Sequence, residues 1–233
     1  MGPDGVGFAG DGRSPQGGAH DGPAGVPAGV LGHHFSSIER QNEAMRLGMW
    51  LFLATEVLLF AGLFCGYTVY RFQFPQAFKE CSRHLEIGLG TLNTVVLITS
   101  SFTVALAIHY ARVDKPKLAA ACLFVTLLFA LAFMGIKAEE YRAHFAAHEY
   151  PGKFYRGEVH VAGAAMFYSL YFLMTGLHGI HVVAGGTVLF ILMVRTWYGR
   201  YSSAYYTGLE MGGLYWHLVD LVWIFLYPLL YLI

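Results

Sequence analysis

The sequence has 233 residues, of which 56% are hydrophobic, 16% aromatic and 13% charged, whereas a soluble domain is roughly half apolar and about one-quarter charged. This composition excludes an ordinary soluble globule. The 15 basic and 15 acidic residues balance and form no basic block, which argues against nucleic-acid binding. Cys65, Cys81 and Cys122 have neither the number nor the spacing of a disulfide scaffold or a structural zinc site.

Residues 1–34 are predicted to form a flexible Gly/Pro-rich tail. Residues 1–32 contain 11 Gly and 4 Pro and almost no large apolar side chain, so they cannot bury enough surface to offset their ordering entropy. The segment has no apolar h-region, and we therefore do not expect a cleaved secretory signal. The stretch Ser36-Ser37-Ile38-Glu39 matches a capping box and predicts a short polar helix that continues into Leu47, although a chance match is the alternative.

Residues 35–233 contain five apolar runs, each long enough to cross a bilayer core about 30 Å thick as a helix. The expected spans are about 47–70, 87–110, 118–140, 163–194 and 211–233. The fourth lies in an uninterrupted run, Val159–Val194, and is predicted to be one tilted helix with an interfacial lead-in. Backbone amides in lipid must be hydrogen-bonded within the protein, which only helices and closed β-barrels achieve, and the sequence lacks the alternation typical of a barrel. The predicted fold class is therefore an all-α membrane protein, a bundle of five transmembrane helices.

Glu56 lies near the middle of the first predicted span. A charge at that depth costs about 2.5–3.5 kcal/mol unless it faces a partner or a cavity. We expect a structural hydrogen bond inside the bundle; a part in proton movement or lipid contact is the alternative.

His178 and His181 are three residues apart, which places both on one face of the fourth span. We expect both to form hydrogen bonds across a close helix contact made by small residues, with ligation of a metal or haem as the alternative. The small residues are Gly176, Gly179, Gly185 and Gly186. His109, at a span end, is expected at the interface.

The last span carries His217 and Asp220, again three apart. The two side chains are predicted to interact with each other and to form a polar patch that faces the inside of the bundle. A proton relay is the alternative. At the end of the third span, Lys137, Glu139 and Glu140 form a charged cluster that is expected to reach the interface, with Lys137 and Glu139 solvated. No nucleophile with a base, phosphate-binding Gly loop or two-His-one-carboxylate set is recognisable.

Five ordered segments carry a family resemblance: Leu47–Gly62, Leu92–Thr94, Lys137–Tyr141, Thr175–Val182 and Tyr215–Tyr227. Together they resemble subunit III of the haem–copper cytochrome c oxidases, from about Phe35 to the C-terminus. Many members of that family have seven spans, and this sequence resembles the last five. In seven-span members the two helix groups enclose a phospholipid cleft, so one wall of that cleft is expected to be absent here or supplied by another subunit.

The resemblance implies a subunit without haem or copper, with neither catalytic nor metal-binding residues of its own. It would pack on subunit I beside subunit II, in a complex whose partner is cytochrome c. There it would support proton uptake and protect the enzyme from turnover inactivation. Membership of a larger respiratory supercomplex stays open. The implied location is the bacterial inner membrane, with a cytoplasmic N-terminus and a periplasmic C-terminus, which the distribution of Lys and Arg near the span ends slightly favours.

The same resemblance assigns individual residues. Glu56 matches the family's buried, carbodiimide-reactive carboxyl beside the lipid cleft, which has been linked to oxygen access. Arg195 matches a position that holds a phospholipid head group. The family's polar positions inside the bundle are matched by Glu140, His178, His181, His217 and Asp220.

Three other functions fit parts of the pattern. A quinol oxidase subunit III and an accessory protein of nitric oxide reductase both resemble the same five spans. A free-standing membrane cytochrome, with His178, His181, His109 and His217 as haem ligands, belongs to a different class.

Overall fold

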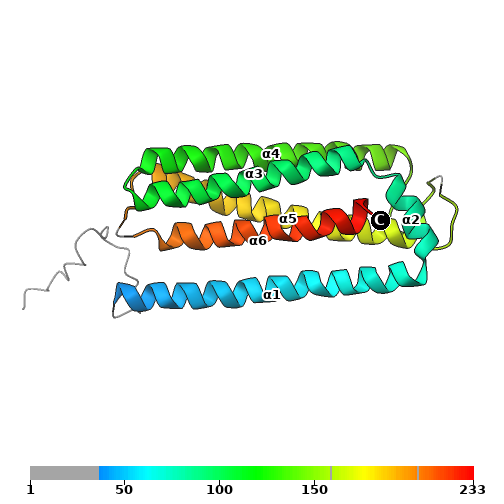
Figure 1. The fold of residues 1–233 in the computed structure, drawn as a ribbon, viewed down its shortest axis with the longest axis horizontal. Coiled ribbons are helices and arrows are strands. Elements are labelled where there is room, and N and C mark those ends of the chain that lie inside the picture. Colours follow the sequence, from blue (N-terminus) through cyan, green and yellow to red (C-terminus); the bar gives the residue numbers. More distant parts are fainter. Residues whose placement is uncertain (1–36, 158, 204) are drawn as a thin grey trace, which may run out of the picture.

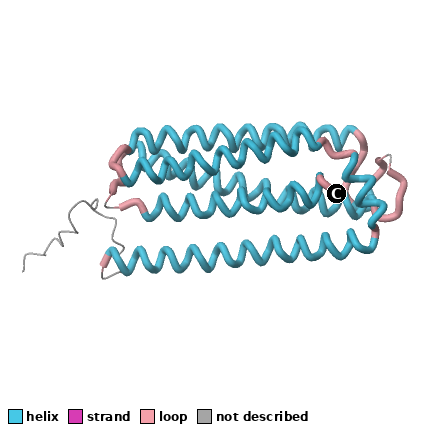
Figure 2. Tube along the Cα trace, in the orientation of Figure 1, coloured by secondary structure: helices cyan, strands magenta, loops and turns pink. Residues whose placement is uncertain are grey.

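The computed structural model describes residues 37–157, 159–203 and 205–233, which form an elongated helical bundle (Figure 1). The elements are α1 (Ile38–Gln73), α2 (Pro75–Arg83), α3 (Ile87–Arg112), α4 (Pro116–Ala146), the 3-10 turn η1 (Gly152–Phe154), α5 (Ala164–Trp197) and α6 (Thr207–Tyr231). Loops join the long helices at the two ends of the bundle (Figure 2). Five of the described helices, all except α2, are long and apolar enough to cross a membrane, which confirms the predicted fold class. The predicted tail, residues 1–34, lies outside the described residues.

Most helix ends extend beyond the predicted spans, because polar turns continue past the apolar core, but α5 begins one residue after the predicted start and α6 ends two residues before the predicted end. The N-cap of α1 is Ser37, whose side chain accepts a hydrogen bond from the Arg40 amide at 3.3 Å. The helix therefore starts one residue later than a capping box on Ser36 would place it, and Ser36 itself is outside the described residues. The fourth apolar run forms a single helix, α5, as expected.

Helix α2 was not predicted, since at nine residues it is too short to be found by a search for spans. Pro75 stands in its first turn, where a missing N–H costs nothing. Phe78 on its buried face packs edge-on against Tyr67 of α1 and Phe167 of α5, with ring centroids 5.1 and 5.3 Å apart. The α2 helix thus closes one end of the bundle, beside the C-terminus of the chain (Figure 1).

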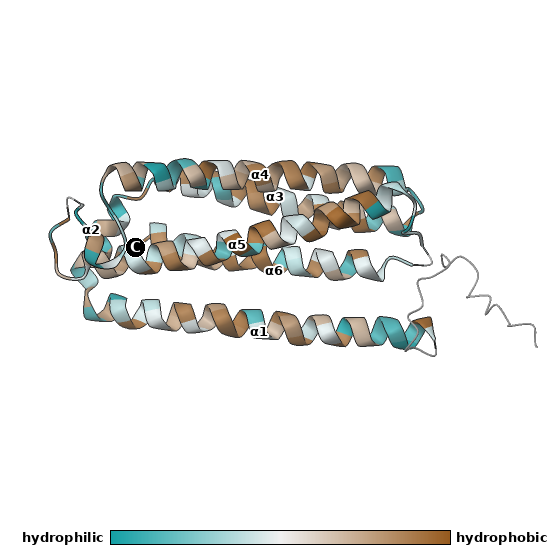
Figure 3. Cartoon of the chain, turned by 180° about the vertical axis from the view of Figure 1, so that it is seen from behind, coloured by the Kyte–Doolittle hydropathy of each residue, from teal (hydrophilic) through white to brown (hydrophobic). Residues whose placement is uncertain are grey.

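Helix α1 attaches to the bundle along a narrow seam. Its buried residues are Gln41, Leu53, Phe60 and Tyr67, and the last three are spaced by seven, so they form one stripe. The Tyr67 hydroxyl donates to the carbonyl of Leu229 at 2.6 Å, one of the last carbonyls of α6 that the helix itself leaves unpaired. Figure 3 shows mainly hydrophobic colours over the middle of the long helices, interrupted by hydrophilic bands on α1 and α6, and hydrophilic colours toward the helix ends.

Polar contacts join α3 and α6 along their length. The indole N–H of Trp216 donates to Ser100 Oγ, and that of Trp223 donates to Thr94 Oγ1, each at 3.1 Å. Nearer the C-terminus the hydroxyls of Tyr227 and Thr91 are 2.7 Å apart. Indole and hydroxyl groups buried in a membrane need such partners, and these contacts therefore fix the register of the two helices.

Candidate functional site

Glu56 of α1 and His181 of α5 form a hydrogen-bonded pair between helices. His181 Nε2 lies 2.8 Å from Glu56 Oε2, and Nδ1 lies 2.8 Å from the carbonyl oxygen of Leu177. A carbonyl only accepts, so Nδ1 carries a proton; Nε2 then either accepts from a protonated Glu56 or, in an imidazolium, donates to the carboxylate. The two side chains are only 15% and 13% exposed. The structural hydrogen bond predicted for Glu56 is confirmed.

His178 contacts different helices from those that contact His181. Its ring lies edge-on to Phe133 of α4 and tilted against Trp223 of α6, with centroids 5.6 and 5.3 Å apart. Neither ring nitrogen has a hydrogen-bond partner among the described residues. The predicted hydrogen bond across helices is therefore correct for His181 and wrong for His178. Residues three apart on a helix still differ by roughly 60° around its axis, which is enough to turn them toward different neighbours.

His217 and Asp220 do not pair with each other, contrary to the prediction. Nδ1 of His217 lies 2.5 Å from the hydroxyl of Ser101 on α3. Asp220 is only 3% exposed, and neither of its carboxyl oxygens has a hydrogen-bond partner within the described part of the chain. The polar patch therefore joins α6 to α3 through the histidine and leaves the carboxyl unsatisfied.

Lys137 and Glu140 lie at the centre of a buried network at the end of the bundle that holds α2. The Lys137 ammonium donates to Glu140 Oε2 at 3.0 Å and to the hydroxyls of Tyr171 and Tyr231 at 3.2 and 2.8 Å. The two tyrosines in turn donate to Glu140 Oε1 at 2.8 and 2.5 Å. The Lys137 and Glu140 side chains are 7% and 3% exposed. The solvated position predicted for Lys137 is wrong, whereas Glu139, 71% exposed, is at the surface as expected.

The helical period of α4 explains why Lys137 is inside. Buried residues recur along one face of the helix, and Lys137 and Glu140 continue that face beyond Phe133. From Thr126 onward, the buried positions of α4 are Thr126, Ala130, Phe133, Lys137, Glu140 and His144. Extending this periodicity through the charged residues would have found Lys137; its two tyrosine partners, on α5 and α6, come from tertiary packing and give no local signal.

A second carboxyl extends the network into the loop after α4. His144 Nδ1 lies 2.5 Å from Glu149 Oε2, and the Tyr168 hydroxyl of α5 donates to Glu149 Oε1 at 2.6 Å. His144 Nε2 is also 4.0 Å from Glu140 Oε1. The chain of contacts therefore ties the loop to α4 and α5, and neither Glu149 nor Tyr168 was among the predicted site residues.

The stability of this loop contact is expected to depend on acid pH. Burial acts to raise the pKa of Glu149, but the hydrogen bonds from His144 and Tyr168 outweigh it and hold this pKa below its ordinary value of 4.5. A carboxyl with a lowered pKa in the folded state stabilises the fold above the unfolded-state pKa and loses that effect as the pH falls through the folded-state value. At pH values below about 4.5, the unfolding temperature of the chain in detergent should therefore decrease.

Glu149→Gln should flatten this acid limb, and Glu139→Gln, at an exposed site, should leave it unchanged. Thermal unfolding of the three chains between pH 3 and pH 7, followed by circular dichroism, makes the comparison. Superimposable profiles for the wild type and Glu149→Gln would show that the Glu149 contact does not contribute.

Arg195 lies exposed in the last turn of α5, at the opposite end of the bundle from the Lys137 network. At that end Arg112 of α3 forms an ion pair with Glu210 of α6, and Arg46 of α1 lies 3.7 Å from the same carboxylate. These contacts join three helices. Arg195 is an exposed residue, and its role in lipid binding stays a prediction.

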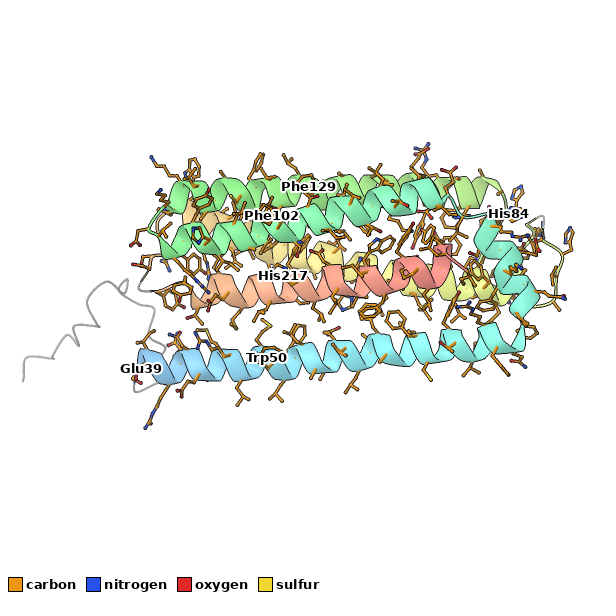
Figure 4. All side chains as sticks on the ribbon, in the orientation of Figure 1. Glu39, Trp50, His84, Phe102, Phe129 and His217 are labelled. Atoms are coloured by element: carbon orange, nitrogen blue, oxygen red, sulfur yellow. The ribbon has the colours of Figure 1, made fainter. Side chains whose placement is uncertain are left out.

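The histidines do not converge on one point. His178 contacts α4 and α6, His181 contacts α1, His217 contacts α3, and His109 lies against Tyr110 of its own helix. Figure 4 labels His217 on α6 beside Phe102 on α3. Within residues 37–157, 159–203 and 205–233, no three His, Cys, Asp or Glu side chains are grouped so that they could hold a metal ion. The contacts of Glu56 with His181, of His217 with Ser101, and of Lys137 and Glu140 with Tyr171 join one helix to another.

The comparisons with known proteins agree with this architecture. The family model for cytochrome c oxidase subunit III matches residues 26–233. The chain is 32% identical over 208 residues to cytochrome c oxidase subunit 3 of Latimeria chalumnae, covering 86% of this chain and 72% of that protein. It is 30% identical over 209 residues to the probable quinol oxidase subunit 3 of Staphylococcus aureus (strain USA300), covering 87% of this chain and 97% of that protein. The chain is thus an integral membrane protein that belongs to the cytochrome c oxidase subunit III family.

Proposed function

We propose that this chain is the non-redox subunit III of a proton-pumping haem–copper cytochrome c oxidase in aerobic respiration. It packs on subunit I, beside subunit II, and supports proton uptake and turnover stability there. The observation that carries the proposal is that ionisable side chains bond to partners on other helices, as in Glu56–His181 and Lys137–Tyr231. Groups committed to such contacts stiffen a bundle and are not arranged as a relay.

In this proposal the haem and copper centres belong to partner subunits. Family membership supports this assignment, as does the divergence of the histidines toward different helices. The residues of this chain then position helices and exclude disordered lipid beside subunit I, and no electron-transfer step passes through them.

The proposed location is the bacterial inner membrane, with the N-terminus in the cytoplasm. The Lys137 network and the C-terminus then lie on the periplasmic side, and Arg195 lies on the cytoplasmic side, where its guanidinium could bind a phospholipid head group. Phospholipids are accordingly proposed as partners.

A quinol oxidase subunit III is the second candidate, because a relative of nearly the same length has the name probable quinol oxidase subunit 3. The electron donor binds to other subunits, so the two candidates differ in composition of the complex. An accessory subunit of nitric oxide reductase would differ in its catalytic partner.

Purification through a tag on this chain, in mild detergent, tests the proposal. We expect a haem–copper subunit I and a copper-containing subunit II to co-purify, with haem absorbance in the complex and none in the isolated chain. A core without a copper-containing subunit II would favour the quinol oxidase. A nitric oxide reductase partner, or a haem Soret band from the isolated chain, would overturn the proposal.

Glu56→Gln is expected to leave assembly and electron transfer within about twofold of the wild type. The glutamine amide can still donate to Nε2 of His181, and the interhelical hydrogen bond is retained. Glu56→Leu, the paired variant, leaves Nε2 of His181 without its hydrogen-bond partner and should lower the stability by about 1–3 kcal/mol. The measurements are oxygen consumption and thermal unfolding of the purified complex; complete loss of oxidase activity in a fully assembled Glu56→Gln complex would argue for a direct role in turnover.

A further inference from the structure

Three cavities lie one after another along the seam between α4 and α5, with volumes of about 400, 350 and 380 Å³. The second and third cavities share Met134 and Val183 as lining residues, and the first continues one turn beyond the second on both helices. We call this continuous hollow the α4–α5 groove. Its lining positions recur every three or four residues, so they form one stripe on each helix. On α4 the stripe contains Ala120, Phe124, Leu127, Leu131, Met134 and Ala138.

Three glycines of α5 contribute to this groove. Gly176 and Gly179 line the third cavity, and Gly186 lines the second. A Cβ at these positions would lie 3.8, 3.9 and 4.0 Å from its nearest neighbour, so the packing of α5 against other helices does not require glycine there. The missing side chains instead leave space on the outer surface, and a molecule that fills this space gains dispersion contacts.

The polar side chains that line the groove are hydrogen-bonded within the chain. The hydroxyls of Tyr141 and Thr175 are 2.6 Å apart, and Thr187 Oγ1 donates to the carbonyl of Val183 at 2.8 Å. Lys137 is bonded in the network described above. A polar side chain of another protein would therefore enter the groove without a partner, at a cost that a hydrocarbon chain does not incur. The lining favours an acyl chain as the occupant.

A lysine without an ion-pair partner lies at the mouth of the groove. Lys117 is exposed and lies on the same face of α4 as Ala120 of the first cavity, one turn nearer the helix end. No carboxylate in the described part of the chain is within ion-pair distance of its ammonium; Asp114 accepts hydrogen bonds from Ser203 instead. The first turn of α4 contains no acidic residue that would compensate the positive end of the helix dipole. Both features attract an anionic group.

Trp197 and Tyr198 place the first cavity at the membrane–water interface. They line this cavity, are 63% and 79% exposed, and belong to the residue types that gather at head-group level. From Ala120 to Met134 the groove follows 14 residues of α4, roughly 21 Å, whereas half of the hydrocarbon core is about 15 Å thick. An acyl chain whose head group lies at Lys117 therefore stays in the groove as far as the centre of the bilayer.

We propose that the α4–α5 groove binds an anionic phospholipid, whose phosphate pairs with Lys117 and whose acyl chain lies along the groove past Gly186. This site is separate from the predicted lipid contact of Arg195, which is not among the residues that line the three cavities. The inference does not rest on the proposed function, since it concerns the surface of this chain in any complex.

Photo-labelling by a lipid tests the proposal. The complex, purified through a tag on this chain, is reconstituted into phosphatidylcholine vesicles that contain a minority of phosphatidylglycerol. A diazirine on the acyl chain marks either lipid, at equal probe concentration, and labelled peptides are identified by mass spectrometry after irradiation. The phosphatidylglycerol probe should label residues 120–134 and 183–198 about fivefold more than the phosphatidylcholine probe, the ratio to which about 1 kcal/mol of attraction per lysine corresponds.

Two substitutions separate the head-group contact from the groove. Lys117→Gln should remove the preference and bring the labelling by the two lipids to within about twofold. Ala121→Leu fills the start of the groove at an exposed position and should lower the labelling by both lipids severalfold. The matched controls are Lys79→Gln, at an exposed lysine of α2, and Ala105→Leu, at an exposed alanine of α3; both should leave the labelling unchanged.

Three results would overturn the proposal. Equal labelling by the two lipids, or a preference that Lys117→Gln leaves unchanged, would mean that only unselected bulk lipid fills the groove. Absence of label from α4 and α5 would mean that a protein segment covers it. A preference lost in Arg195→Gln but kept in Lys117→Gln would assign the lipid to the Arg195 position. None of these results affects whether an oxidase core co-purifies, so the proposed function is tested separately.

Discussion

Lys137→Met is expected to lower the free energy of unfolding by about 3–5 kcal/mol, because it leaves the Glu140 carboxylate buried without its cation. The two side chains are 3.0 Å apart and 7% and 3% exposed, so water cannot replace the lost partner. Tyr171 and Tyr231 continue to donate to Glu140 but do not neutralise it. Chemical unfolding of the purified chain in detergent, and its abundance in membranes, are the measurements.

The double variant Lys137→Met/Glu140→Gln should recover more than half of that loss. The glutamine carbonyl still accepts from both tyrosines, and no unpaired charge stays inside. Glu139→Gln is the control, since Glu139 and its partner Arg142 are 71% and 79% exposed; it should change stability by less than about 0.5 kcal/mol. Equal stability of Lys137→Met and Glu139→Gln would show that Lys137 is solvated after all.

Adjacent glycines on α5 should respond with opposite signs to alanine. A Cβ at Gly185 would lie 2.9 Å from the ring of Trp216, which is fully buried and held by its bond to Ser100. The ring cannot move away, so Gly185→Ala is expected to cost about 1–3 kcal/mol. At Gly186 the nearest atom is Leu127 Cδ2 at 4.0 Å, and Gly186→Ala should stabilise the helix by about 0.5–1 kcal/mol.

Unfolding of both glycine variants under identical detergent conditions gives the comparison. Destabilisation by Gly186→Ala as large as that by Gly185→Ala would mean that α5 needs glycine for its backbone and not for the approach of α6. The expected close contact at the four glycines of α5 is present at Gly185 only; at Gly176 and Gly179 a Cβ would have 3.8 and 3.9 Å to its nearest neighbour.

The apolar runs were sufficient to predict the five spans, because a membrane helix must be predominantly apolar where it crosses the hydrocarbon core. They were insufficient for α2, whose nine residues are held by tertiary contacts of Phe78. Among the polar residues, the hydrogen bond of Glu56 inside the bundle was predicted correctly from the free-energy cost of a charge in the membrane core. The position of Lys137 was predicted wrongly, because a charged cluster ordinarily marks the end of a span, whereas the buried face of α4 continues through this residue.

The partners of polar side chains could not be predicted from sequence spacing. His217 and Asp220 share a helix, yet His217 bonds to Ser101, a residue 116 positions away. Lys137 reaches Tyr231 across 94 positions. Such pairs depend on helix rotation and register, which side chains along the entire interface determine together. A spacing of three within one helix identifies neighbours on the surface and does not decide which of them interact.

Turnover of the purified oxidase complex, with this chain present and after its removal, tests most directly whether the chain is a supporting subunit. We predict that the depleted complex keeps its haem and copper and much of its initial rate of oxygen consumption, but loses activity severalfold faster during sustained turnover. An unchanged initial rate together with an unchanged lifetime would contradict the supporting role, and loss of a haem or copper centre with the removed chain would contradict its assignment as non-redox.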